Sequence, residues 1–424
     1  MKETFKKLIV NFHERIFSHI AEREYQIPTD TKKIVSLIGV RRSGKTYILF
    51  SIIEKLRKVI DPENIIYINF EDDRLYPLGL KDLDNLMEGY YELFPQKRDE
   101  KVYLFLDEVQ NVEGWERYIR RVDDTLDLQL FITGSSSKLL SSEIATSLRG
   151  RTITYEIFPF SFREYLQYRE IEINLYSSKS VSYIQNAFSS YLVNGGFAET
   201  FDETPDVQKQ ILKDYLDLII YKDVVERYAI KNQSLLKHLI KYLFVNMGTL
   251  ISVNKLYNDY KSQGYKVGKD TLHDYISYLQ EAYALFTTPI HRHSVREEQR
   301  NPKKLYAIDN GFKKLFSISI SDDYSKLYEN LAFLHLRRTS DEVYYFKQKQ
   351  EVDLYVKRDK EQLVNVSYLI EDEKTLAREV NALVEGMEYF NLSKSYLVTA
   401  SRDEMIEVDG RVIEIVPMWK WLLD

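Results

Sequence analysis

Short apolar runs alternate with amphipathic stretches along the first third of the chain. Four of these runs are IVSLIGV (34–40), IIYINF (65–70), VYLFLD (102–107) and LQLFIT (128–133). Such runs are typical of parallel strands buried on both faces, and the stretches between them carry apolar residues at helical spacing. The alternation predicts an α/β domain with a helix-covered parallel sheet over 1–158. Residues 1–30 are expected to form an amphipathic helix, and ITYEIFP (153–159) is a candidate last strand.

The pattern changes twice after this domain. Between 159 and 300 apolar residues recur every three or four positions, which predicts helices, and the order helix, turn, helix, strand over 251–289 suits a winged-helix module. From 301 to 424 β-rich alternation returns with helices between the strands, which predicts a second α/β unit. The predicted organisation is therefore three domains, at 1–158, 159–300 and 301–424.

Composition narrows the class of protein. The chain has 424 residues, a net charge of −6 and no cysteine, which excludes disulfides, thiolate metal sites and a cysteine nucleophile. The N-terminal stretch mixes charged and apolar residues, so it does not look like a secretory signal, and no apolar run is long enough to span a bilayer. We expect a soluble, cytoplasmic protein that makes no membrane contact.

The strongest chemical signal is the octapeptide GVRRSGKT (39–46), between the first predicted strand and a helix. It matches the P-loop pattern, in which backbone N–H groups cradle phosphate oxygens and glycines allow the turn. Lys45 is expected to bind the β- and γ-phosphates, and the Thr46 hydroxyl to bind Mg²⁺. The ligands expected are thus ATP and Mg²⁺. The expected nucleotide contacts are Gly39, Arg41, Arg42, Ser43, Gly44, Lys45, Thr46 and Tyr47.

Two further strand ends carry polar residues. VYLFLDE ends in Asp107 and Glu108, at the edge where open parallel sheets bind their ligands. Asp107 is expected to hold Mg²⁺, and Glu108 to polarise the attacking water as the catalytic base. LQLFITGSS (128–136) offers Thr133 or Ser135 to orient that water or to sense the γ-phosphate, although a serine-rich turn is the alternative interpretation.

Phosphoryl transfer also favours a cation near the γ-phosphate. SLRGR (147–151) supplies Arg149 and Arg151 as candidate arginine fingers, and Arg227 is a further candidate beside the two P-loop arginines. Surface ion pairs are the alternative role, and the sequence leaves open whether a finger acts in its own chain or on a neighbour. Glu71 and Asp72 could face the nucleotide or cap the next helix.

Several segments together resemble one family. GVRRSGKT, INFEDDRL, FLDEVQNVEGWERYIRRV, ITGSSSKLLSSEIATSLRGR and FPFSFREYL are similar, in order and spacing, to archaeal and bacterial AAA+-type P-loop ATPases, relatives of origin-recognition and STAND ATPases. NGGFAE, YKDVVERY and NPKKLYAIDNGF resemble the later parts of the same group. The resemblance implies an ATP-hydrolysing domain, a helical lid with a winged helix, and a C-terminal nuclease-like domain.

In that group the C-terminal domain resembles PD-(D/E)XK nucleases, whose carboxylates bind Mg²⁺ and whose lysine adds positive charge. Glu329 and Asp353 match the first two positions. Asn365 and Ser367 stand at the places of the third acid and the lysine and cannot replace them, while Lys349 is a nearby alternative lysine. The resemblance therefore implies a degenerate domain that keeps the nuclease shape and has lost cleavage.

DNA remains a candidate partner. The presumed recognition helix is not basic, but HRHSVREEQRNPKK (291–304), where a wing would lie, has five lysines and arginines against two glutamates. A solvated linker is the alternative interpretation. The chain is thus expected to be a Mg²⁺-dependent AAA+ ATPase, a homo-oligomeric motor or remodeller that contacts DNA. The alternative is a STAND-like nucleotide-gated switch or scaffold that recruits a protein without binding DNA.

Overall fold

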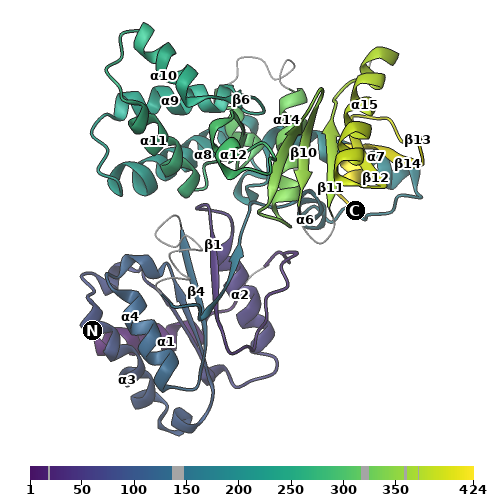
Figure 1. Ribbon diagram of the computed structural model, residues 1–424. Coiled ribbons are helices and arrows are strands. Elements are labelled where there is room, and N and C mark those ends of the chain that lie inside the picture. Colours follow the sequence, from purple (N-terminus) through teal and green to yellow (C-terminus); the bar gives the residue numbers. More distant parts are fainter. Residues whose placement is uncertain (18–19, 136–147, 317–323, 358–360, 371) are drawn as a thin grey trace. The chain divides into compact units, whose positions relative to one another are not determined.

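The computed structural model describes residues 1–424 apart from 18–19, 136–147, 317–323, 358–360 and 371 (Figure 1). The chain divides into two compact units, Met1–Ile157 and Phe158–Asp424. Helices and strands occur in both units, so the predicted α/β class is confirmed. None of the helices in the described part of the chain has the length and apolarity that crossing a bilayer requires.

The first unit contains a five-stranded sheet, parallel throughout, in the order β2-β3-β4-β1-β5. Its strands are β1 (Ile34–Gly39), β2 (Ile65–Asn69), β3 (Val102–Asp107), β4 (Leu128–Ser135) and β5 (Thr152–Glu156). The predicted parallel sheet is confirmed. Because β4 lies between β1 and β3, the end of β4 lies between the end of β1 and the end of β3, where Asp107 and Glu108 stand.

Helices cover both faces of this sheet. They are α1 (Lys2–His13), α2 (Lys45–Leu56), α3 (Asp84–Leu93) and α4 (Trp115–Thr125). Figure 1 shows α2 on one side of the sheet and α3 and α4 on the other. The apolar face of α2, including Ile48 and Ile52, packs with Val35, Phe105 and Phe131 of the strands in one buried cluster. This packing fixes the start of α2, and therefore the P-loop, against the sheet.

The predicted helix over 1–30 is wrong in its length, because α1 ends at His13 and the described residues from 14 to 33 form no helix. The Arg57 guanidinium satisfies carbonyl groups near this end: it donates hydrogen bonds of 2.8 Å to the carbonyl oxygens of Phe12, in the last turn, and Arg15, just beyond the helix. Carbonyls taken by a side chain at the last turn no longer need partners from a further helical turn. Helical periodicity alone cannot reveal this competition.

The second unit begins with helices and continues into a small antiparallel sheet. The helices are α6 (Phe162–Tyr168), α7 (Ser178–Asn194), α8 (Pro205–Leu218), the π-helix η8 (Ile219–Glu226), α9 (Gln233–Val245), α10 (Val253–Ser262) and α11 (Lys269–Glu281). The sheet has the order β6-β8-β7, from β6 (Leu250–Ile251), β7 (Leu285–Thr288) and β8 (Lys303–Ala307). The short helix α12 (Val295–Arg300) lies in the connection between β7 and β8.

A six-stranded mixed sheet in the order β13-β14-β12-β11-β10-β9 completes this unit. Its strands are β9 (Val343–Lys347), β10 (Glu351–Val356), β11 (Gln362–Val366), β12 (Lys394–Thr399), β13 (Glu404–Val408) and β14 (Arg411–Pro417), and its helices include α13 (Asn310–Lys313), α14 (Tyr324–Arg337), α15 (Glu373–Phe390) and α16 (Met418–Trp421). The predicted boundary at 300 stays a prediction. Strand β8, just beyond it, pairs with both β6 and β7.

One buried contact ties α7 to the segment that follows β8. Asp309 accepts hydrogen bonds of 2.7 Å from the backbone N–H groups of Gly196 and Gly311. Burial raises the pKa of the Asp309 carboxyl to about 7, against the opposing effect of these two bonds. Gly195 has a φ of 80°, and a Cβ added there would lie 1.7 Å from Asp309 Oδ1. The segment around Gly195 can therefore approach Asp309 this closely only because residue 195 has no side chain.

We expect Gly195→Ala to lower the free energy of unfolding by about 3 kcal/mol or more, because strained backbone and a steric clash with a buried carboxylate add together. Gly264→Ala is the matched control, since Gly264 has a φ of 84° but no heavy atom within 4 Å of an added Cβ. The control should lose only about 1 kcal/mol. Urea denaturation measures both, and equal losses would show that the Asp309 contact is unimportant.

Candidate functional site

The loop after β1 is shaped by two glycines. Gly39 has a φ of 140°, and a Cβ added there would lie 2.2 Å from the carbonyl oxygen of Ile157, so only glycine fits. Gly44, with a φ of 94°, is the N-cap of α2, and Arg42 between them also has a positive φ of 65°. The loop thus leads into a helix whose first N–H groups lack helical partners and attract anions.

Two side chains of the loop are buried with phosphate-binding chemistry. Lys45 is 4% exposed, and its Nζ donates to the carbonyl oxygens of Gly39 and Val40, at 3.0 Å each. The Ser43 hydroxyl is buried and lacks a hydrogen-bond partner among the described residues. An ammonium and an unpaired hydroxyl enclosed by a backbone loop are suited to phosphate oxygens. Tyr47, by contrast, lies on α2 with 58% exposure.

Asp107, at the end of β3, is the central carboxylate of the site. It is fully buried and accepts three hydroxyl hydrogen bonds: from Thr46 and Tyr67 to Oδ2, each at 2.8 Å, and from Thr133 to Oδ1. Burial raises the pKa of the Asp107 carboxyl, as does the neighbouring charge of Glu108, whereas the three hydroxyl bonds lower it. The P-loop threonine and the β3 carboxylate therefore meet, as a shared metal site requires.

The Thr133 hydroxyl bridges the Asp107 carboxylate and the backbone N–H of Glu108. Strand pairing sets Leu106 opposite Ile132, so that Thr133 of β4 lies beside the end of β3. Its hydroxyl donates to Asp107 and accepts a 3.0 Å bond from the backbone N–H of Glu108. Glu108 itself has a φ of 55°, and its Oε2 accepts a bond from the Gln110 amide. Ser135 ends β4 opposite Gly39.

Glu71 and Asp72 have different roles. Asp72 caps the short 3-10 helix η2 (Asp73–Leu75) by accepting from the backbone N–H of Arg74 at 3.0 Å, and it also pairs with the Arg74 guanidinium. Glu71 lies 3.5 Å from the P-loop residue Arg41. Burial and the nearby charge of Glu108 raise the pKa of the Glu71 carboxyl. Glu71 thus lies at the P-loop edge, the side of the sheet formed by the carboxyl ends of the strands. Asp72 instead serves as the cap of η2.

Sequence reasoning missed two residues of the site. Arg23, from the segment before β1, donates a 2.9 Å bond to the carbonyl oxygen of Ser43 inside the P-loop. Tyr67 lies two positions before the end of β2, where nothing in the IIYINF run distinguishes it from a core aromatic residue. Its ring stacks on Phe12 of α1 with centroids 4.6 Å apart, while its hydroxyl reaches Asp107.

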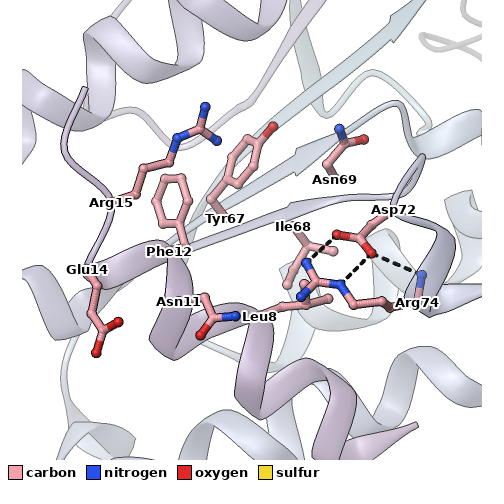
Figure 2. A pocket seen from close by; sticks show the side chains of 10 residues that line it. All are labelled: Leu8, Asn11, Phe12, Glu14, Arg15, Tyr67, Ile68, Asn69, Asp72 and Arg74. Atoms are coloured by element: carbon pink, nitrogen blue, oxygen red, sulfur yellow. Dashed lines mark hydrogen bonds and ion pairs between the residues drawn. The ribbon is translucent and has the colours of Figure 1, made fainter. Parts of the chain in front are cut away.

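Tyr67 also lines a pocket of about 450 Å³ beside α1. Figure 2 shows its ring next to Phe12 and Arg15, with the Asp72–Arg74 pair elsewhere on the pocket wall. One side of this residue is therefore accessible from the pocket, and its hydroxyl is fixed on the central carboxylate. The stacking of Tyr67 on Phe12 fixes the tyrosine ring, and its hydroxyl in turn orients the Asp107 carboxylate.

Arg151 lies away from the P-loop in the first unit, and the role of Arg149 or Arg151 as an arginine finger stays a prediction. Ile34 and Thr152, the first residues of β1 and β5, are paired in the parallel ladder. Arg151 therefore lies at the amino ends of the strands, whereas Gly39 lies at the carboxyl end of β1. Five residues of strand correspond to about 16 Å. Arg151 instead pairs with Asp123 at 3.4 Å and Asp124 at 3.0 Å. Action on a neighbouring chain stays a prediction.

Five arginines gather at the amino ends of the strands. They line a second pocket, of about 460 Å³, with Asp124 and Thr125: Arg117, Arg120, Arg121, Arg149 and Arg151. Arg227 follows η8 in the second unit, for which no arrangement relative to the first is determined.

The residues of the P-loop edge fit ATP with Mg²⁺. The buried Ser43 hydroxyl without a described partner and the Lys45 ammonium suit phosphate oxygens, and the Thr46 hydroxyl with the Asp107 carboxylate forms an all-oxygen donor set. Oxygen donors are those that Mg²⁺ prefers. The expected contacts of the loop therefore have the chemistry that their proposed ligands need.

Comparison with known proteins agrees with this geometry. A family model described as an AAA domain matches residues 31–166, and a domain of unknown function, DUF8612, matches 185–319. The uncharacterized protein MJ1544 of Methanocaldococcus jannaschii is 36% identical over 417 residues, covering 95% of this chain and 91% of that protein. An uncharacterized Haemophilus influenzae protein is 29% identical, covering 93% and 95%.

Solved structures give weaker matches. The Aeropyrum pernix ORC1 protein in complex with DNA has a TM-score of 0.31 at 14% identity, covering 77% of this chain and 91% of that one. AMPPCP-bound DnaA from Aquifex aeolicus has a TM-score of 0.26 at 16% identity, covering 66% and 86%. Scores at this level do not establish a common overall arrangement. The P-loop geometry and the AAA match together place the first unit among P-loop ATPase folds.

Thr133→Val should lower the free energy of unfolding by about 2–4 kcal/mol, because the isosteric side chain leaves the Glu108 N–H without its acceptor and Oδ1 of the buried Asp107 carboxylate without its described donor. Thr125→Val is the control: it removes one exposed 2.8 Å bond to the Arg121 carbonyl and should cost about 0.5 kcal/mol. Denaturant titration followed by circular dichroism measures the difference. A Thr133→Val protein as stable as the control would contradict the bridging role.

Proposed function

Because the chain belongs to the same family as the uncharacterized M. jannaschii protein MJ1544 and contains an AAA domain, we propose that it binds ATP with Mg²⁺ and hydrolyses the γ-phosphate bond. The observation that carries the proposal is the contact between Thr46 and Asp107, which brings the P-loop hydroxyl to a buried carboxylate at 2.8 Å. Glu108 follows directly on that carboxylate.

In the proposed reaction each side chain has one task. Lys45 leaves its loop carbonyls and binds phosphate oxygens, with the loop N–H groups and Ser43 around them. Thr46 and Asp107 hold Mg²⁺, which when bound neutralises charge on the phosphates. Glu108 accepts the proton of the attacking water, and Thr133 fixes the Glu108 backbone beside Asp107. Arg41, close to Glu71, is placed to respond to the γ-phosphate.

We further propose that Arg149 or Arg151 acts in trans. Both lie at the sheet edge opposite the P-loop, where five arginines line one pocket. In a head-to-tail homo-oligomer such an edge can meet the nucleotide edge of the next subunit. An arginine supplied across a subunit interface stabilises the developing charge of phosphoryl transfer. This arrangement supports the oligomeric form of the proposed ATPase.

The direct test compares Lys45→Ala with Glu108→Gln. Lys45→Ala should lose ATP affinity and turnover, because the ammonium supplies much of the phosphate charge compensation. Glu108→Gln should keep ATP affinity and lower kcat by about 10²–10⁴-fold, which is the usual contribution of a general base. Calorimetric titration with a non-hydrolysable analogue and a phosphate-release assay measure the two properties. Full ATP affinity and turnover in Lys45→Ala would overturn the proposal.

For the output of the ATPase we propose a DNA-interacting motor or remodeller, with the winged-helix order of α10, α11, β7 and β8 as support. A specific observation favours the alternative, a switch or scaffold for a protein partner. Two of the five cations in 291–304 are used within the chain: Arg292 donates to the Lys347 carbonyl at 2.9 Å, and Lys304 is buried. The remaining cations are Arg296, Arg300 and Lys303.

If DNA is bound through this segment, changing Arg296, Arg300 and Lys303 to Ala should weaken affinity and reduce the slope of log affinity against log salt by about 3. The charge-matched control changes Lys209, Lys213 and Lys222, which are exposed on α8 and η8. Fluorescence anisotropy at several salt concentrations measures both variants. Equal effects of the two variants, or no DNA binding by the wild type, would favour the protein-recruiting switch.

A further inference from the structure

A buried lysine stands at the centre of an acidic cluster in the second unit. Lys304 of β8 is 3% exposed, and its Nζ lies 2.7 Å from Asp353 Oδ1, 3.0 Å from Glu329 Oε1 and 3.2 Å from Glu351 Oε1. The three carboxylates come from two different elements, α14 and β10. An ammonium has three N–H donors, so one lysine can serve all three acids at once.

Neighbouring groups hold the carboxylates in this arrangement. Tyr306 donates its hydroxyl to Glu329 Oε1 at 2.8 Å, and the backbone N–H of Val366 donates to Asp353 Oδ2 at 2.9 Å. Asn365 accepts from the backbone N–H of Asp353 at 3.0 Å and donates to Glu379 Oε2 at 2.8 Å. Asp353 is thus held through the oxygen that does not face the lysine, and Glu329 through the same oxygen that Lys304 contacts.

This cluster contains two of the residues predicted for a degenerate nuclease site, Glu329 and Asp353, together with a lysine that was not among them. Glu329 and Asp353 meet, and Asn365 lies beside them, as the resemblance implies. Lys349 is exposed, and its backbone N–H bonds to Glu385 instead. The lysine that does enter comes from 49 residues before Asp353, on a strand of the other sheet.

We infer that Lys304 is a resident cation, whose ammonium takes the place of a divalent metal among Glu329, Glu351 and Asp353 and fastens the β7–β8 connection to the C-terminal sheet. The three oxygens lie 2.7–3.2 Å from Nζ, the range of N–H···O hydrogen bonds. Oxygens bind Mg²⁺ at about 2.0–2.1 Å and Ca²⁺ at 2.3–2.6 Å, whereas charged N–H···O contacts lie near 2.7–2.9 Å. Among the described residues, no group of three His, Cys, Asp or Glu side chains is arranged to hold a metal ion.

Hydrogen bonds to backbone carbonyl oxygens extend the same connection. The N–H of His291 donates to the Tyr345 carbonyl at 2.7 Å, the Tyr345 hydroxyl donates to the Pro302 carbonyl at 2.7 Å, and Arg292 reaches the Lys347 carbonyl. Residues 289–304 are therefore bonded to β9 at several points, and Lys304 adds the ionic contact to β10 and α14. The segment is thus held to the C-terminal sheet by hydrogen bonds and by the ionic contact, and none of these contacts involves a residue of the proposed nucleotide site.

Lys304→Met tests the inference on the full-length chain, with Lys303→Met on the same strand as the matched control. Removing one partner of a buried ionic cluster leaves the others uncompensated. The melting temperature of Lys304→Met should fall by about 6–15 °C, and the control by less than about 2 °C. Hydrogen exchange should accelerate in β8 and β10 of Lys304→Met only. Equal behaviour of the two variants would overturn the inference.

A triple variant separates charge from packing, and remains informative if Lys304→Met does not fold. Adding Glu329→Gln and Asp353→Asn to Lys304→Met removes two unpaired charges and should recover at least half of the lost melting temperature. A triple variant no more stable than Lys304→Met would overturn the ionic role, because a lysine needed only for its aliphatic stem predicts no recovery.

Metal binding is tested with Mn²⁺ as the probe. For each protein, the melting temperature is measured in Mn²⁺ and in EDTA. The difference between the two conditions should be the same for the wild type and for Asp353→Asn, because the cluster already has its cation. A Mn²⁺-dependent shift that disappears in Asp353→Asn would show a metal at this site and would overturn the inference.

Discussion

The carboxylate of Asp107 is the constraint around which the first unit is arranged. It is buried and held by hydroxyls from three different elements: Thr46 at the start of α2, Tyr67 on β2 and Thr133 on β4. Neutral hydroxyls orient a carboxylate without neutralising it, so its charge stays available to a cation from solution. A shift of α2, β2 or β4 relative to β3 would break one of these bonds, so the geometry of the site depends on the packing of the sheet.

Much of this arrangement could be predicted from the sequence, because its signals are local. GVRRSGKT, the apolar run before Asp107 and the alternation of strands with helices each depend on neighbouring residues, and the parallel sheet brings their ends to one edge. Tyr67 could not be predicted in the same way, since its role depends on a hydroxyl reaching across from β2 to β3. A tyrosine in a buried run is indistinguishable from a core residue until the register is known.

The predictions that are wrong, or that missed a residue, share a long-range cause. Arg57, at the end of α2, contacts the last turn of α1, and Arg151 lies before the start of β5, at the end of β1 that is remote from the P-loop. The acidic cluster of the second unit depends on Lys304, which is remote in sequence from the strand it joins. Sequence spacing identifies which chemistries are present, but only the strand pairing decides which of them meet.

The two acidic sites of the chain therefore have opposite electrostatic designs. Around Asp107 the described donors are hydroxyls, so the charge of the carboxylate is left for a cation from solution. The state of this site can therefore change when such a cation binds. Around Asp353 the chain supplies Lys304 itself, so the charge is compensated on folding, and the result is a fixed connection. In the proposed ATPase, the Asp107 site would change state when the nucleotide binds. The Lys304 cluster would hold the parts of the second unit together during that change.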